Sequence, residues 1–326
     1  MWKRKIFWLT IIHTCIFSLI AFNLRCRQRE SKGGPGQQIL ESETATAGYI
    51  VVQGSDTASP MMLRAAEVFM DLYSKAKILV LGSGSKAGIA ALNEGKARIA
   101  VMSRQLNSQE KKILTLNGIE IEEFKIALDG VAVIVNPTNT MERLTLPQIA
   151  KIFKGEIRNW QSLGGLNLPI IVVTRASNSG TYEYFQNEVL AGHKYSVKAY
   201  PCTTTIQVIE MVGKYKGAIG YIGMNRLYRS WEPWPPQPDE RIKTLSVAKD
   251  AKSDFIYPDQ ETVDNKTYPL IREIYLYTNK NEENKHERGL SSLANGFVSF
   301  LMHSQGQKVV AAYGFVPVTV PVKIRK

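Results

Sequence analysis

Four short polar turns carry the residues of this sequence that could do chemistry. Each turn follows an apolar stretch, contains Gly, Ser, Thr or Asp, and precedes a stretch with helical periodicity; the turns span residues 54–57, 82–88, 103–104 and 175–181. The first turn of a helix has backbone N–H groups without helical partners, and the helix dipole makes that end positive. Hydroxyl side chains add donors, and glycine lets a ligand approach closely. Together the four turns predict a cage for a small oxyanion.

A single turn of this kind is weak evidence, because Ser, Thr and Asp cap helices in proteins of every class. Four such turns, of which two contain an arginine, are stronger evidence. Their number does not identify the ligand.

The elements that must position these turns alternate along the chain from about Tyr49. Apolar positions at Met62, Ala65, Phe69 and Leu72 share one face of a helix that opens at Asp56-Thr57. We expect strands at 50–52, 77–81, 99–102, 131–135 and 170–174, and further helices at 85–94, 108–116, 146–153 and 179–190. Strands that alternate with helices predict an α/β architecture with largely parallel sheets.

Composition limits the class of protein. The chain has 326 residues, of which 44% are hydrophobic, and this length suits two packed domains. Three cysteines and four histidines are scattered, which argues against a disulfide scaffold and against a Cys/His metal cluster. We therefore expect no metal site and no cofactor.

The net charge of +12 first suggests a polyanionic partner. About half of this charge lies in residues 1–32, where seven basic residues face Glu30 alone, and three further basic residues lie at 323–326. A nucleic-acid footprint needs clustered charge on the folded body, and the remaining positions show none. We expect no nucleic-acid partner.

The N-terminal leader has a basic start, MWKRK, and a mostly apolar run from Ile6 to Phe22. This pattern is typical of an export signal or of an N-terminal membrane anchor, and both readings of residues 1–26 stay open. Cys26 is a candidate for lipidation, although Arg25 is not the small residue that usually precedes such a cysteine. Residues 27–47 read as a flexible tether.

The order of motifs resembles the substrate-binding proteins of phosphate ABC transporters, the PstS-like family. The similarity runs from about Tyr49 to the C-terminus. It rests on Gly54-Ser55-Asp56-Thr57, the turn at 82–88, Ser103-Arg104-Gln105-Leu106, residues 129–136, 152–155 with Asn159-Trp160, Arg175 with Ser179-Gly180-Thr181, residues 217–221 and 268–270, and the tail from Phe297 through Gly306-Gln307 to 314–317.

The resemblance implies a type II periplasmic-binding-protein fold, in which two α/β lobes are joined by crossover strands and close on a ligand cleft between them. By analogy, lobe I holds 48–129 and 255–326, and lobe II holds 130–254. The phosphate-binding residues that it implies are Ser55, Asp56, Thr57, Ser83, Ser85, Ser103, Arg104, Arg175, Ser179, Gly180 and Thr181. Arg175 is the best candidate for a direct, charge-assisted contact, whereas the sequence does not decide between Ser83 and Ser85.

One departure from the family concerns the choice of anion. An acidic residue often stands two positions after the arginine of the fourth turn, and here that position is Ser177. Phosphate keeps a proton at neutral pH and sulfate does not, so a buried carboxylate favours phosphate. Asp56 could take over this acceptor role. The alternative for Asp56 is an ordinary helix cap.

The resemblance implies a non-enzymatic, extracytoplasmic protein that captures inorganic phosphate for an ABC permease. We expect a monomer in the periplasm or on the outer face of the membrane, held by the anchor or by a lipidated Cys26, or secreted after cleavage. The alternatives are another tetrahedral oxyanion as ligand, a phosphate sensor, and an enzyme on phosphate esters. The last is disfavoured, because Asp56 is the only Asp, Glu or His on the four turns.

Overall fold

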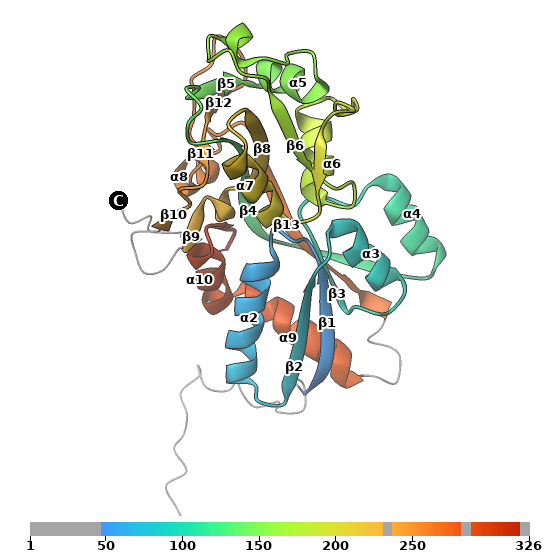
Figure 1. The fold of residues 1–326 in the computed structure, drawn as a ribbon. Helices are drawn as coiled ribbons and strands as arrows, with labels where there is room; N and C mark the ends of the chain where they lie inside the picture. Colours follow the sequence, from blue (N-terminus) through green and yellow to red (C-terminus); the bar gives the residue numbers. More distant parts are fainter. Residues whose placement is uncertain (1–46, 231–236, 282–287, 320–326) are drawn as a thin grey trace, which may run out of the picture. The chain divides into compact units, whose positions relative to one another are not determined.

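The computed structural model describes residues 47–230, 237–281 and 288–319 (Figure 1). The leader, Cys26 and residues 27–46 of the tether lie outside the described residues, and so do Lys323, Arg325 and Lys326 at the C-terminus. Within the described ranges, no helix is both long enough and apolar enough to cross a membrane.

Most strands belong to one ten-stranded sheet with the order β2-β1-β3-β13-β4-β8-β6-β7, and β11 and β14 pair with β4 beside this path. Strand β1 is parallel to β2 and β3, and β6 is parallel to β7 and β8, whereas β13 and β4 are antiparallel to their neighbours. The strands are β1 (Gly48–Gly54), β2 (Ala76–Gly82), β3 (Ile99–Met102), β4 (Ile121–Val135), β5 (Arg143–Thr145), β6 (Ile171–Arg175), β7 (Tyr200–Cys202), β8 (Ala218–Gly223), β9 (Tyr228–Ser230), β10 (Gln237–Pro238), β11 (Lys243–Thr244), β12 (Ser246–Ala248), β13 (Ile271–Asn279) and β14 (Val316–Pro317).

Helices follow most of these strands, as the alternating pattern predicts. They are α2 (Ser59–Leu72), α3 (Ser85–Asn93), α4 (Ser108–Leu116), α5 (Leu146–Lys154), α6 (Gly180–Glu188), α7 (Thr205–Lys214), α8 (Gln260–Asp264), α9 (Arg288–Met302) and α10 (Ser304–Ala312), with short 3-10 helices η1 (Trp160–Leu163) and η2 (Met224–Arg226). Helix α2 buries Met62, Ala65 and Phe69 as expected, but Leu72 is 47% exposed because the helix ends there.

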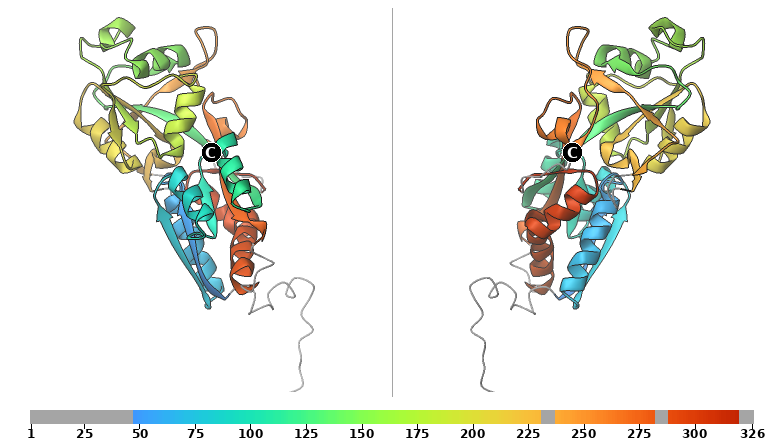
Figure 2. Two further views of the ribbon diagram at one scale, coloured as in Figure 1. Left: turned by 90° about the vertical axis from the view of Figure 1, so that its right-hand side faces the viewer. Right: turned by 90° about the vertical axis from the view of Figure 1, so that its left-hand side faces the viewer.

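The described residues have three sets of buried apolar side chains. The smallest set packs α3 and α4 against β3 and β13, and the two larger sets form separate cores that share β4 and β13. Side chains of β1, β2, α2 and α9 form one core, in which Phe69 and Phe297 are buried, and the aromatic side chains Trp160, Phe153 and Tyr221 lie in the other. Seen from either side, the green and yellow elements of the middle of the chain form one body and the blue elements lie in the other (Figure 2). We call the body with α2 the first lobe and the body with α6 the second lobe. Two α/β bodies that share the strands β4 and β13 agree with the arrangement that the resemblance implies.

Strands β4 and β13 serve both cores. Ile126 and Ala127 of β4 pack in the core of the first lobe, whereas Val131 and the residues after it pack in the core of the second. The segment before β13 also contributes to the second core, through Val263 and Tyr268. The boundaries of the lobes stay a prediction, and the crossing strands bring the turns of both lobes to one place.

Candidate anion-binding site

All four predicted turns meet between the lobes and bury hydroxyl groups there. The Oγ1 atoms of Thr57, before α2, and Thr181, in the first turn of α6, are 3.2 Å apart. The Oγ atoms of Ser85 and Ser103 are 3.4 Å apart. The six buried hydroxyl residues of the site are Ser55, Thr57, Ser85, Ser103, Ser179 and Thr181, each at most 4% exposed.

Gly180 brings the first turn of α6 against the serines of the other lobe. A Cβ atom at Gly180 would lie 2.3 Å from Ser85 Oγ and 2.6 Å from Ser103 Oγ, which is closer than atoms can approach. The missing side chain is therefore what lets the two lobes come together at this point.

The N-termini of α3 and α6 supply backbone donors beside these hydroxyls. Helix α3 begins at Ser85 after Gly84, whose φ of 94° suits glycine, and its N-cap makes no side-chain hydrogen bond. Helix α6 begins at Gly180, and the N-cap Ser179 accepts a hydrogen bond from Thr181 N. Lys86 N in the first turn of α3 donates to the Asn178 carbonyl at 3.3 Å. The N–H groups that remain in both first turns have no helical partner, as an anion site requires.

Ser103 and Arg104 were expected at a third helix start, and that expectation is wrong. Helix α4 begins only at Ser108, and its capping box uses Asn107 and Glu110. The capping residue Asn107 is thus five positions beyond the end of β3, so Ser103 offers its hydroxyl without a helix dipole behind it.

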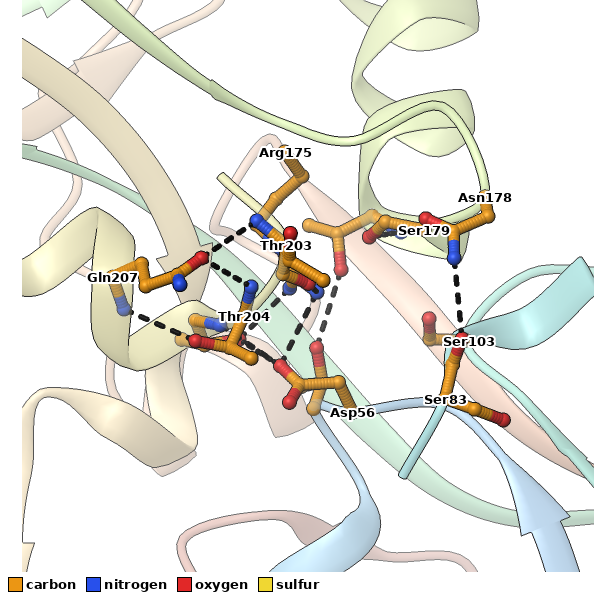
Figure 3. A network of polar contacts seen from close by, with 12 residues as sticks. Asp56, Ser83, Ser103, Arg175, Asn178, Ser179, Thr203, Thr204 and Gln207 are labelled. Atoms are coloured by element: carbon orange, nitrogen blue, oxygen red, sulfur yellow. Dashed lines mark hydrogen bonds and ion pairs between the residues drawn. The ribbon is translucent and has the colours of Figure 1, made fainter. Parts of the chain in front are cut away.

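Between the two serines of the second turn, Ser85 lies nearer to the other hydroxyls. Ser83 is only half-buried, and its Oγ accepts a hydrogen bond from Gln53 Nε2 at 2.9 Å. Its carbonyl accepts one from Asn178 Nδ2 of the other lobe at 3.2 Å (Figure 3). Ser83 therefore joins the lobes by its backbone, and Ser85 holds the better position for an anion.

Arg175 is the most buried cation on the four turns, with 2% of its side chain exposed. Its guanidinium donates to Thr205 Oγ1 at 2.8 Å and to the Thr203 carbonyl at 2.9 Å, and it lies 3.2 Å from Asp56 Oδ2 (Figure 3). Among the described residues, its Nε has no hydrogen-bond partner. Burial lowers the pKa of Arg175, and the Asp56 carboxylate opposes this effect. A buried N–H donor without an acceptor favours a bound anion.

Asp56 reaches across to the second lobe. Its Oδ2 accepts hydrogen bonds from Thr205 N at 2.9 Å and from Thr205 Oγ1 at 2.7 Å, at the start of α7. A carboxylate is stabilised at the N-terminus of a helix. Asp56 therefore caps α7 from the other lobe while it neutralises Arg175, and the contacts in the described structure all fall on Oδ2.

The guanidinium of Arg104 donates hydrogen bonds to other groups of the protein. Its two Nη atoms donate to Glu110 at 2.7 and 2.8 Å, Nη1 also donates to the Gln105 carbonyl, and Nε donates to Glu183 of the second lobe. Lys86 Nζ lies 3.0 Å from the other oxygen of Glu183. Arg104 thus forms an ionic junction between the lobes, and its role as a direct ligand stays a prediction.

The pairing of Glu110 with Arg104 gives the first lobe an acid-sensitive contact. Burial raises the pKa of Glu110, but hydrogen bonds from Arg104 and from the Asn107 N–H outweigh burial and hold the pKa below its ordinary value of 4.5. A carboxyl group whose pKa is lower in the folded state than in the unfolded state stabilises the folded protein at pH values above its unfolded-state pKa. This stabilisation is lost as the pH falls through the folded-state pKa.

We therefore expect Glu110→Gln to lower the melting temperature by about 1–3 °C at neutral pH. The difference from the wild type should shrink as the pH falls below 4.5 and vanish once Glu110 is protonated. Thermal unfolding of both proteins from neutral pH to below pH 4.5 measures this difference in melting temperature. Glu94→Gln, at the exposed pair with Lys96, is the control, and an equal effect of both variants at all pH values would contradict the prediction.

Several residues that contact the predicted site residues were not predicted from the sequence. Thr203 and Thr205 belong to the start of α7, which carries the same Thr-rich capping pattern as the predicted turns. Arg272 lies 3% exposed in β13 and donates to Thr181. A charged residue inside the apolar stretch 270–278 is the signal that could have identified it. The described residues contain no cluster of metal-ligating side chains.

Comparison with known proteins places this arrangement in a family. The model of the PBP superfamily domain matches residues 41–305. The phosphate-binding protein PstS of Pseudomonas aeruginosa is 27% identical over 303 residues, which are 89% of this chain and 88% of that protein. PstS of Staphylococcus aureus is 29% identical over 289 residues, with 87% and 81% covered.

Solved structures agree with the sequence relatives. A putative phosphate ABC transporter substrate-binding protein with bound phosphate from Clostridium perfringens has a TM-score of 0.70 and 30% identity, and the match covers 83% of this chain and all of that one. An ABC-type phosphate transport receptor from Vibrio cholerae has a TM-score of 0.63 and 27% identity, with 82% and 99% covered. The family model covers most of the chain, and the chain is a member of the PBP superfamily.

Proposed function

We propose that this protein is the substrate-binding protein of an ABC phosphate importer, which captures inorganic phosphate between its lobes and delivers it to the permease. The observation that carries the proposal is the meeting of buried hydroxyls, two helix N-termini and the unpartnered Arg175 Nε at one place. A tetrahedral oxyanion offers acceptors in several directions, which suits such a set of donors.

The relatives support phosphate as the ligand. The Pseudomonas and Staphylococcus proteins are named phosphate-binding, and the Clostridium structure contains phosphate. We propose the four turns as the site, with Ser85, Thr57, Thr181 and Gly180 as its centre. We also propose that the chain works outside the cytoplasm as a monomer, tethered by its N-terminal segment, without enzymatic activity.

Isothermal titration of the purified full chain with phosphate, sulfate and arsenate tests the ligand. We expect tight, saturable binding of phosphate and of arsenate, which has the same shape and keeps a proton at neutral pH. Weak or absent phosphate binding would reject the proposal. A phosphatase assay with and without divalent metal tests the enzymatic alternative, and turnover at the rates usual for enzymes would favour that alternative.

Asp56 is the residue that we expect to favour phosphate over sulfate. Ser177 is exposed, so it takes no part in the choice, whereas Asp56 lies next to Arg175. Because Oδ2 already accepts two hydrogen bonds from Thr205 and lies 3.2 Å from Arg175 in an ion pair, Oδ1 is the atom that could accept the phosphate proton. The negative charge of the half-buried Asp56 disfavours the fully deprotonated sulfate.

We therefore expect Asp56→Asn to let sulfate compete with phosphate in a calorimetric titration. The ratio of the phosphate affinity to the sulfate affinity should fall by at least about tenfold. The substitution removes both the charge-assisted hydrogen bond that Asp56 accepts from phosphate and the repulsion between Asp56 and sulfate. Asp71→Asn, at an exposed position of α2, is the control. A ratio that stays at the wild-type value would place the acceptor elsewhere.

A further inference from the structure

Arg272 and Asp129 form a buried ion pair on the two strands that pass between the lobes. They face each other directly in the register of β13 and β4. Arg272 Nε and Nη2 donate to Asp129 Oδ2 at 2.9 and 2.7 Å, and the two side chains are 1% and 0% exposed. Two donors on one carboxylate oxygen fix the plane of the guanidinium.

The outer edge of this guanidinium reaches one hydroxyl from each lobe. Nη1 donates to Thr181 Oγ1 at 2.7 Å, and Nη2 lies 3.4 Å from Thr57 Oγ1. Arginine can only donate hydrogen bonds, so both hydroxyl oxygens act as acceptors toward it. The two oxygens lie 3.2 Å apart, so one hydroxyl can donate to the other, and the second hydroxyl is left to donate to another acceptor.

The geometry points to Arg272 as a positioning residue that turns the remaining hydroxyl proton of the Thr57–Thr181 pair toward the bound anion. Asp129 holds Arg272 in place for this role. Because Thr57 and Thr181 come from different lobes, the contact also links binding to closure. The inference rests on the proposed function, since it gives Arg272 a role in phosphate binding.

The charges near Arg272 agree with this role. Burial lowers the pKa of Arg175, and the positive charge of Arg272 lowers it further, which means that the two guanidinium groups repel each other. An anion between two repelling cations relieves this repulsion. Arg272 also lies beneath the Tyr184 ring, at 6.0 Å from the ring centre, which keeps water from its remaining face.

A double-mutant cycle with phosphate affinity as readout tests the inference on the full chain. Arg272→Lys keeps the charge but loses the planar fork, and Thr181→Val keeps the shape but loses the hydroxyl. We expect Arg272→Lys to weaken phosphate binding about tenfold in the wild-type background and less than about twofold in the Thr181→Val background. Thr181→Ser, which keeps the hydroxyl, should leave the tenfold effect intact.

The matched control is Lys125→Gln, which breaks an exposed ion pair with Glu273 on the same two strands and should not change affinity. If Arg272→Lys does not fold, Arg272→Gln with Asp129→Asn removes both charges, and its affinity should be equally insensitive to Thr181→Val. Equal losses in both backgrounds, or no loss, would overturn the inference while wild-type binding still supports the proposed function. Absence of wild-type binding would reject both.

Discussion

Arg175→Ala is expected to weaken phosphate binding by at least about 100-fold. Charge-assisted hydrogen bonds contribute about 1.5–3 kcal/mol each, and a guanidinium can supply two of them to one oxyanion. The removal of Arg175 also leaves the Asp56 carboxylate with its Thr205 contacts alone, and this negative charge then repels the ligand. Titration calorimetry with phosphate measures the loss.

Arg158→Ala is the control for Arg175→Ala. Arg158 is exposed in the second lobe and donates to the Gly155 carbonyl, so its loss should leave affinity unchanged. Arg175→Lys should fall between the wild type and the alanine variant, because lysine keeps the charge and loses the fork. A loss below tenfold in the alanine variant would mean that the hydroxyls and helix ends bind the anion without Arg175.

Local sequence patterns predicted the elements well where periodicity and capping agree. The strand at 99–102 and the helix at 108–116 have the expected bounds, because a short apolar run and an Asn-to-Glu capping box mark them clearly. The strands expected at 77–81 and 170–174 differ from β2 and β6 by one residue at each end. Local signals therefore fixed the positions of the turns as well.

The partners of each turn could not be predicted in the same way. Arg272 contacts Asp129, Thr181 and Thr57 over separations of 143, 91 and 215 residues. No local pattern encodes such contacts, which depend on the crossing of β4 and β13. The same holds for Arg104, whose local partner Glu110 is visible in the sequence but whose partner Glu183 lies in the other lobe.

The choice between two similar residues also depended on the tertiary structure. Ser83 and Ser85 are both plausible in the turn at 82–88. The hydrogen bond from Gln53 to Ser83 and the burial of Ser85 next to Ser103 separate them. Likewise, the resemblance implied both Arg104 and Arg175 as ligand-binding residues, with Arg175 as the best candidate for a direct contact. The structure separates them, because carboxylates occupy the fork of Arg104 and the Nε of Arg175 is unpartnered among the described residues.

Gly180→Ala is expected to abolish tight phosphate binding while each lobe stays folded. The new Cβ would overlap Ser85 Oγ at 2.3 Å and Ser103 Oγ at 2.6 Å. Both serines are at most 1% exposed, so neither side chain can move aside without opening the contact between the lobes. The cores on either side are not touched, so the melting temperature without ligand should stay close to that of the wild type.

Calorimetry and small-angle X-ray scattering together measure the effect of Gly180→Ala. We expect an affinity loss of more than about 100-fold, since closure and the α6 donors are lost together, and no compaction on addition of phosphate. Asn187→Ala, at an exposed position of the same helix, controls for the change of helix propensity. Adding Ser85→Gly removes the nearer clash and should restore compaction in part, although one hydroxyl is lost. If Gly180→Ala binds phosphate as tightly as the wild type does, anion binding does not depend on the contact between α6 and the two serines. The binding site then lies elsewhere between the lobes.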